Sequence, residues 1–189
     1  MELENNKITR RLFIALEVPD DVKTKLLELK KMVQLKNHYP WEAKDKLHIT
    51  LCFLGEVDGD QIPSIENLME RLAKHKKIGC KIPKFSFFGR PGNPNILYAA
   101  VKTDKKHMLL LRRLYKGLKE LNIDTGAPRY KQHITLLRIK EKLEEGFVEA
   151  FSNFQFENIS FIASEMVLYE STLLQTGSIY KQLKTIYLS

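Results

Sequence analysis

The sequence lacks the features that mark several classes of protein. It has only two cysteines, Cys52 and Cys80, whose spacing matches no metal-binding motif, so we expect reduced thiols and no disulfide framework. No apolar run approaches the ~20 residues that cross a bilayer, and residues 1–7 are polar and acidic, without the apolar core of a signal peptide. No nucleophile-elbow pattern is present. We therefore expect a cytoplasmic protein that neither spans a membrane nor uses a serine hydrolase site.

Size and charge narrow the interpretation further. A chain of 189 residues buries roughly 70% of the surface that its unfolded chain exposes, so we expect residues 1–189 to form one domain. We also expect a monomer. Lysine and arginine number 31 against 23 acidic residues, a net charge of +8. This balance favours a polyanionic partner without identifying one.

One tetrapeptide occurs twice. His-Ile-Thr-Leu occupies residues 48–51 and again residues 133–136. At this composition a His-x-Thr pattern should arise by chance only about 0.2 times, so we interpret the pair as a duplication. In a strand alternate side chains share one face, which places His48 beside Thr50 and His133 beside Thr135, with apolar residues on the opposite face.

The elements around the two copies follow a similar order. Short apolar runs predict strands, and apolar residues spaced by three or four predict amphipathic helices. The expected order in the first half is strand 11–18, helix 22–33, strand 47–54, helix 62–72 and strand 78–88. In the second half it is strand 96–101, helix 108–118, strand 133–138, helix 143–151 and a strand region within 156–169, with a closing strand at 178–188.

This order predicts two similar lobes. Phe13 precedes His48 by 35 residues and Tyr98 precedes His133 by 35, so we expect these two rings at equivalent strand positions. Two such lobes related by a pseudo-two-fold axis would bring the His-x-Thr faces to opposite walls of one cleft. We predict an α+β fold, bilobal, in which two pseudo-symmetric lobes of mainly antiparallel sheet, with outer helices, surround a central cleft.

Paired histidines and threonines suit a displacement at phosphorus without a metal. Imidazole titrates near neutral pH, so one ring can act as base while the other acts as acid. A threonine hydroxyl can donate to a non-bridging phosphate oxygen where negative charge develops. The predicted catalytic residues are His48, Thr50, His133 and Thr135. We interpret three further histidines as structural: His38, His75 and His107.

Other residues are candidates for binding, with ordinary packing as the alternative for each ring. Arg138 lies five residues after His133, and a bulge or a strand end would turn its guanidinium toward a phosphate in the cleft. Phe13, Tyr98, Phe53 and Tyr130 are candidates for stacking on a base. Strand alternation places Cys52 on the face of His48 and Thr50, but zinc sites need three or four ligands, so we expect no metal and no cofactor.

Together these segments resemble a known family. Paired His-x-Thr motifs are the signature of the two-histidine phosphoesterase superfamily, and this chain is similar to its RNA 2′,3′-cyclic phosphodiesterases, formerly called 2′-5′ RNA ligases. The similar segments are residues 11–15, 47–55, 133–138 and 168–171, with Gly177 and Tyr180. The family's bilobal α/β arrangement agrees with the predicted repeat.

The resemblance implies hydrolysis of an RNA or nucleotide 2′,3′-cyclic phosphate to a 2′-phosphomonoester, or the reverse ligation. It implies that His48 is the proton donor and His133 the proton acceptor, with Thr50, Thr135 and Arg138 on the phosphate. The residues themselves leave the two histidine roles open, because the two copies are identical. Gln132 stands where many relatives have proline, which leaves the loop geometry and the substrate preference open. The alternatives are a nucleotide- or RNA-binding module with little turnover, or a phosphodiesterase for 2′-5′ oligoadenylate or small cyclic nucleotides.

Overall fold

The computed structural model describes residues 8–33, 35, 38–90, 93–128, 131–140, 143–175 and 177–189. Within them the chain alternates short strands with four α-helices. The first half contains β1 (Thr9–Glu17), α1 (Asp20–Met32), a 3₁₀ turn (Lys44–Lys46), β2 (His48–Asp58), a second 3₁₀ turn (Gly59–Gln61), α2 (Ile62–Leu72), β3 (Ile78–Ile82) and β4 (Phe85–Arg90). The second half contains β5 (Asn93–Ala100), β6 (Lys102–Thr103), α3 (Lys105–Glu120), β7 (His133–Arg138), α4 (Phe147–Asn153), β8 (Ile159–Ala163), β9 (Glu165–Leu174) and β10 (Gly177–Tyr187). The strands pair antiparallel throughout these ranges, which confirms the predicted α+β class.

Each large sheet combines strands from both halves of the chain. One sheet has the order β10-β9-β1-β2 and the other the order β4-β5-β7, while β6-β3-β8 form a smaller third sheet. The predicted strands at 78–88 and 156–169 each divide in two, near Pro83 and at Ser164. The first pieces, β3 and β8, pair with each other, and the second pieces, β4 and β9, cross to the opposite half's sheet. The lobes therefore are not runs of consecutive elements, as the order of the sequence suggested.

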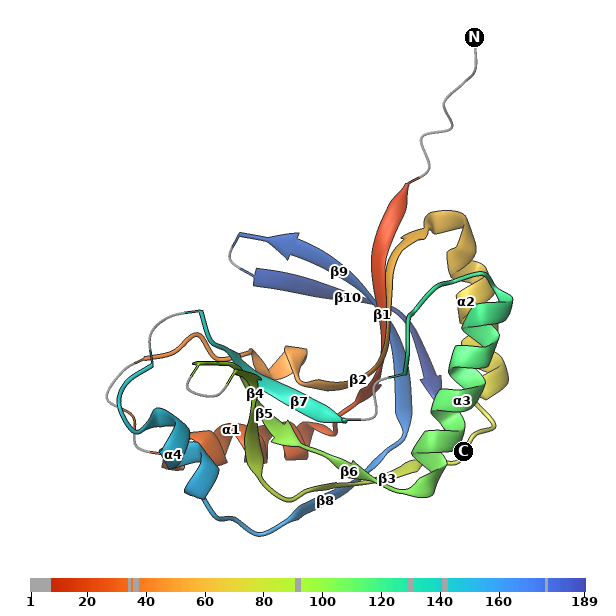
Figure 1. Cartoon of the computed structure of the whole chain (residues 1–189). Coiled ribbons are helices and arrows are strands. Elements are labelled where there is room, and N and C mark those ends of the chain that lie inside the picture. Colours follow the sequence, from red (N-terminus) through yellow and green to blue (C-terminus); the bar gives the residue numbers. More distant parts are fainter. Residues whose placement is uncertain are drawn as a thin grey trace.

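The helices cover the outer sides of the two large sheets. α2 and α3 pack against each other on one side of the molecule, and α1 and α4 lie on the other side (Figure 1). A hydrophobic cluster runs through both sheets and includes Leu16, Ile49 and Ile134. β2 and β7, at the edges of their sheets, contact each other between these layers. None of the described helices is long and apolar enough to cross a membrane.

The packing of α2 on α3 requires a glycine. Gly117 is buried on α3, and a Cβ added there would lie 2.3 Å from Leu68 Cδ1 and 2.9 Å from Leu68 Cδ2. Such overlap in a packed interior usually costs about 1–3 kcal/mol, which exceeds the ~1 kcal/mol that alanine gains in a helix.

We therefore expect Gly117→Ala to lower the free energy of unfolding by about 1 kcal/mol, measured by urea denaturation. The double variant Gly117→Ala/Leu68→Ala should lose less than the sum of the two single variants, because the truncated Leu68 removes the overlap. An additive cycle would show that the two positions do not interact.

Two of the histidines interpreted as structural are buried. His75 is 4% exposed and His107 is 3% exposed, and neither Nε2 atom has a hydrogen-bond partner among the described residues. Burial lowers the pKa of His107 from 6.5 to about 4, an effect that Asp104 opposes and His75 reinforces. The folded protein thus keeps His107 neutral, whereas the unfolded chain takes up a proton below pH 6.5.

Stability should therefore fall as the pH falls from about 6.5 to about 4, with His107 contributing a loss of up to about 3 kcal/mol. In His107→Leu, denaturation at several pH values should show a shallower decline over this window. Lys105→Ala, which changes an exposed residue of the same helix, should keep the wild-type decline. Equal slopes in the wild type and in His107→Leu would contradict the assignment.

Candidate functional site

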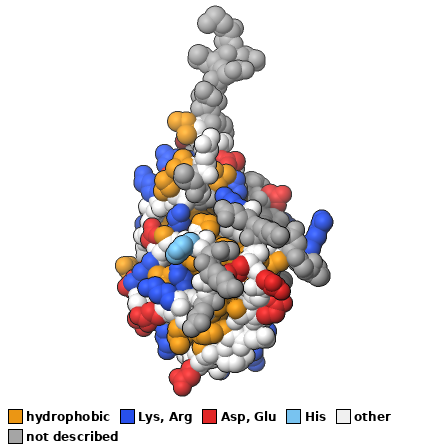
Figure 2. Space-filling view, turned by 90° about the vertical axis from the view of Figure 1, so that its left-hand side faces the viewer, with side chains coloured by type: hydrophobic (Ala, Val, Ile, Leu, Met, Phe, Trp, Pro, Cys, Tyr) orange, Lys and Arg blue, Asp and Glu red, His pale blue; other side chains and the backbone are white. Residues whose placement is uncertain are grey.

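Both His-x-Thr motifs line one cleft. The cleft has a volume of about 540 Å³, within the range typical of sites for small molecules. Its walls include His48 and Thr50 of β2 and His133, Thr135 and Arg138 of β7. Basic and hydrophobic side chains adjoin each other on the face of the molecule shown in Figure 2. The structure therefore brings together the four predicted catalytic residues and Arg138.

A bulge follows each motif and redirects the next side chain. The pairing of β2 with β1 skips Leu51, and the pairing of β7 with β5 skips Leu136. The extra residue reverses the alternation, so the fifth residue after each histidine is exposed while its neighbour is buried. That fifth residue is Phe53 in β2 and Arg138 in β7, and both line the cleft. Of the two features predicted to turn Arg138 toward the cleft, a bulge or a strand end, both are present, because β7 has a bulge at Leu136 and ends at Arg138.

The carbonyl group left by each bulge has a hydrogen-bond donor. The Tyr115 hydroxyl of α3 donates to the Leu51 carbonyl oxygen at 3.4 Å. The Glu42 backbone N–H donates to the Leu136 carbonyl oxygen at 2.9 Å. The Glu42 carboxylate also accepts from Arg138 Nε at 3.1 Å, so one residue supports the second bulge and orients its arginine.

The two histidine rings are held in the same way. His48 Nδ1 lies 2.7 Å from the Lys46 carbonyl oxygen, and His133 Nδ1 lies 2.9 Å from the Lys131 carbonyl oxygen. A carbonyl only accepts, so each Nδ1 must carry a proton and each Nε2 is the atom that can exchange one. His48 Nε2 lies 3.1 Å from Thr50 Oγ1. Each ring is therefore set as an acid or a base through Nε2.

Aromatic rings enclose His48. Its ring centroid lies 5.0 Å from Phe13, 5.6 Å from Tyr180 and 5.9 Å from Tyr169. Behind them, the Tyr169 hydroxyl donates to a Glu17 carboxylate oxygen at 2.7 Å, and the other carboxylate oxygen pairs with Lys23. Burial, reinforced by Glu17, raises the pKa of Tyr169, which keeps its hydroxyl protonated as a donor.

These surroundings favour neutral His48. Burial is the main reason that its pKa falls from 6.5 to about 4; the charges of Arg138, Lys23 and His133 contribute in the same direction, while the bond to the Lys46 carbonyl opposes the shift. Empty of an anion, the cleft therefore holds a neutral first histidine at pH 7. A bound phosphate would add negative charge beside the ring and favour its protonated form.

The second histidine has a different environment. The His133 ring lies 4.8 Å from Phe88 and 5.4 Å from Tyr98, both in edge-on contact. Lys131 Nζ lies 4.9 Å from the Phe88 ring centroid, a cation–π contact at the cleft wall. Identical motifs therefore occupy unlike environments.

Phe13 and Tyr98 support the histidines and do not stack on a base. They are 2% and 1% exposed, so neither presents a ring face to the cleft, and the predicted substrate-binding role is wrong for both. Their predicted equivalence is also wrong, because Phe13 pairs with Phe53 whereas Tyr98 pairs with Thr135. The 35 residues that separate each ring from its histidine include loop and helix residues, and their number does not determine which strand residues pair. Tyr130 lies outside the described residues.

Cys52 and Phe53 exchange the orientations that simple alternation predicts. The bulge at Leu51 buries Cys52, which is 2% exposed and joins the main core, although it still borders the cleft. Phe53 is 46% exposed and is the better candidate for contact with a ligand.

Several residues of the cleft were not predicted from the sequence. Lys46 and Lys131 stand two residues before the histidines, so the duplicated pattern is Lys-x-His-Ile-Thr-Leu, and the shared lysine was the available signal. Phe88 and Glu42 carry no comparable signal, because they come from a different strand and from a loop.

Comparison with known proteins places the chain in a family. Residues 16–98 match the model of the LigT-like phosphoesterases. The chain is 30% identical over 181 residues to an RNA 2′,3′-cyclic phosphodiesterase of Archaeoglobus fulgidus, covering 92% of this chain and 98% of the relative. A Thermotoga maritima protein of the same name is 29% identical over 175 residues, with 92% of each chain covered. The chain belongs to the LigT-like phosphoesterase family.

Solved structures agree with this assignment at the level of the fold. A Thermus thermophilus protein superposes with a TM-score of 0.78 at 24% identity, covering 94% of this chain and 97% of that one. Escherichia coli LigT, crystallised with 3′-AMP, superposes with a TM-score of 0.75 at 20% identity, covering 96% and 99%. The family resemblance inferred from the sequence is confirmed, and the chain is a phosphoesterase.

The phosphoesterase should show an unusual titration of its first histidine. In the ligand-free protein we expect His48 to titrate near pH 4 by NMR of the imidazole ring. Arg138→Gln should raise this pKa toward 6.5, because it removes a nearby positive charge, and inorganic phosphate should raise it as well. Arg10→Gln, on the other face of β1, should leave it unchanged. Titration of His48 near 6.5 in the free wild type would contradict the described burial.

Proposed function

We propose that this phosphoesterase hydrolyses the terminal 2′,3′-cyclic phosphate of RNA or of a nucleotide to a 2′-phosphomonoester, without a metal. The observation that carries the proposal is the pair of Nε2 atoms that the two Nδ1–carbonyl bonds direct for proton exchange in one cleft. The names of the Archaeoglobus and Thermotoga relatives support the substrate class.

The chemistry divides between the two histidines. His133 Nε2 accepts a proton from water as the water oxygen attacks phosphorus. The bond between phosphorus and the 3′ oxygen breaks, and His48 Nε2 gives its proton to that oxygen. The products are the 2′-phosphomonoester and a 3′ hydroxyl, and the enzyme is left with the two protonation states exchanged. The same sequence, with a 5′ hydroxyl in place of water as the nucleophile, forms a 2′-5′ linkage.

The donor role of His48 depends on the substrate. Its low pKa leaves it neutral in the empty cleft, so it must gain a proton after the phosphate anion arrives. His133 contacts the Phe88 ring edge-on, and Lys131 Nζ lies over the same ring. The assignment of donor and acceptor follows the family resemblance, and the different environments of the two rings are consistent with unequal roles.

The remaining residues of the cleft hold the phosphate. The Thr50 and Thr135 hydroxyls donate to non-bridging oxygens, and Arg138 neutralises the charge that grows on them. Glu42 accepts a hydrogen bond from Arg138 Nε at 3.1 Å and so orients the guanidinium at the cleft wall. Both histidines come from one chain, so we propose that the monomer is active.

The test uses a short RNA with a 2′,3′-cyclic phosphate end, in EDTA, with products resolved by chromatography. His48→Ala and His133→Ala should each lower kcat about 10²- to 10⁴-fold, and Thr50→Val or Thr135→Val about tenfold to 10²-fold. His38→Ala, which removes an exposed histidine outside the cleft, is the matched control and should keep full activity. The profile of kcat/KM against pH should be bell-shaped. Binding without product in the wild type would favour a binding module, and turnover of 2′-5′ oligoadenylate alone would change the substrate class.

A further inference from the structure

The sheet that carries His48 extends beyond the cleft. Its face on the His48 side is exposed there. On β1, Phe13 and Ala15 belong to the small hydrophobic cluster beneath His48, while Leu12 and Ile14 belong to the main core on the other face. By alternation Arg11 projects to the same face as Phe13, and it is exposed. This face therefore extends from the catalytic histidine toward the start of β1.

Four side chains, one from each strand, form what we term the distal strip. They are Phe53 of β2, Arg11 of β1, Ser171 of β9 and Tyr180 of β10. Phe53 pairs with Phe13, two residues from Arg11, and the two rings lie 6.0 Å apart. Leu12 pairs with Glu170, the next residue of β9 is Ser171, and Ser171 pairs with Tyr180. The strip thus crosses the whole sheet beside the cleft.

We propose that the distal strip is a subsite for the nucleotides that precede the cyclic phosphate in a single-stranded RNA. The inference rests on the proposed function and deepens it. A 2′,3′-cyclic phosphate terminates the 3′ end, so the rest of the RNA can leave the cleft only in the 5′ direction. The phosphoesterase then prefers oligonucleotides over mononucleotides.

The chemistry of the strip matches single-stranded RNA. Phe53 is 46% exposed at the cleft wall, and an exposed ring on a sheet is a platform on which any base can stack. The Arg11 guanidinium suits a phosphate. Ala15 pairs with Thr50, and four residues of strand separate Ala15 from Arg11, about 13 Å. At that separation along the strand, Arg11 would serve a phosphate next to the one that Thr50 holds.

One group beside the strip opposes the binding of an anion. Glu56 pairs with Arg11 across the two strands, and its exposed carboxylate reduces the positive potential there. Removing the Glu56 carboxylate should therefore strengthen the binding of RNA, which is the opposite of the effect expected from removing the charge of Arg11.

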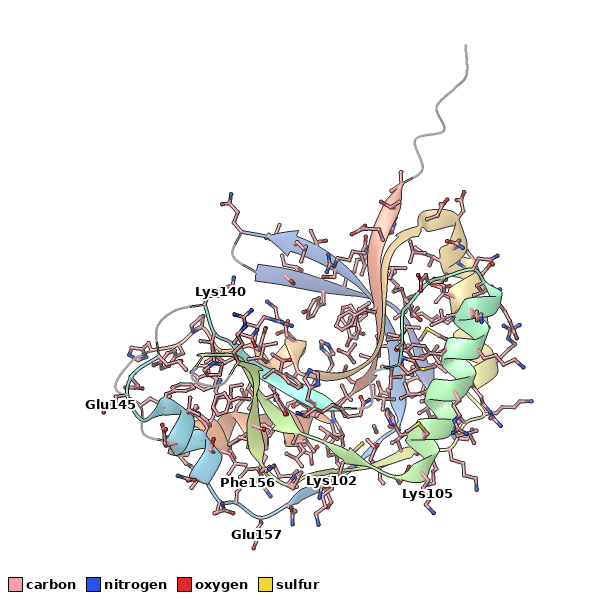
Figure 3. The ribbon with its side chains drawn as sticks, in the orientation of Figure 1. Lys102, Lys105, Lys140, Glu145, Phe156 and Glu157 are labelled. Atoms are coloured by element: carbon pink, nitrogen blue, oxygen red, sulfur yellow. The ribbon has the colours of Figure 1, made fainter. Side chains whose placement is uncertain are left out.

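The chain offers matched controls for the charge of Arg11. Arg10 is its neighbour on β1 but projects to the opposite face, where it pairs with Glu170 at 3.2 Å. Lys102, labelled in Figure 3, lies at the far end of the molecule from the hairpin of β9 and β10. Arg10→Gln and Lys102→Gln each remove one positive charge without touching the strip.

The experiment compares a nucleoside 2′,3′-cyclic monophosphate with a pentanucleotide that ends in a 2′,3′-cyclic phosphate. Arg11→Gln should raise KM for the pentanucleotide about tenfold and leave kcat/KM for the mononucleotide unchanged. In Arg11→Gln, the plot of log KM for the pentanucleotide against log salt concentration should have a slope smaller by about 0.7 than in the wild type. Phe53→Ala should also raise KM for the pentanucleotide more than KM for the mononucleotide. Glu56→Gln should lower KM for the pentanucleotide alone. Arg10→Gln and Lys102→Gln should behave as the wild type.

The two proposals can fail separately. If the wild type turns over both substrates without preferring the pentanucleotide, or if Arg10→Gln acts as strongly as Arg11→Gln, the distal strip is not a subsite although the proposed reaction stands. If the wild type turns over neither, the reaction is wrong. The proposed RNA subsite can then still be tested by fluorescence anisotropy with a labelled pentanucleotide 3′-phosphate. If Arg11→Gln binds this RNA with the affinity of the wild type, the distal strip is not a subsite.

Discussion

The site depends on the contact between two edge strands, β2 and β7, whose motifs face one cleft. Each strand places a histidine and a threonine on its cleft face by simple alternation and then adds one residue to bring a further side chain to the same face. The bulges remain stable because Tyr115 and Glu42 donate to the carbonyl groups at Leu51 and Leu136. A buried carbonyl that has no donor costs about 1–3 kcal/mol, so each of these bonds favours its bulge.

The exchange of strands between the halves supports this contact. β3 leads directly into β4 of one large sheet and β8 into β9 of the other, and the pairing of β3 with β8 therefore joins the two sheets. A continuous hydrophobic cluster joins them as well. The cleft is therefore built from rigid elements on both walls, as positioning a phosphate between two imidazoles requires.

Duplication of the motif did not produce two equal histidines. Both rings use Nδ1 to donate to the carbonyl two residues earlier, which leaves Nε2 for chemistry in each. Around His48, however, three aromatic rings and the positive charges of Arg138 and Lys23 favour the neutral form. His133 instead meets Phe88 and Tyr98 edge-on, with Lys131 over the Phe88 ring. Identical motifs therefore present their imidazole rings in unequal surroundings.

The sequence alone determined the local features of this protein. A repeated His-x-Thr on apolar strands predicts two imidazole–hydroxyl pairs, because strand alternation is a property of the backbone, and helix periodicity located α1, α2 and α3 closely. Tertiary structure decided what lies between distant segments. It paired Phe13 with Phe53 but Tyr98 with Thr135, buried both rings, turned Cys52 inward and Arg138 outward, and brought Glu42 and Phe88 to the cleft. Register and bulges depend on hydrogen bonds between strands far apart in the chain, and no local pattern of residues contains that information.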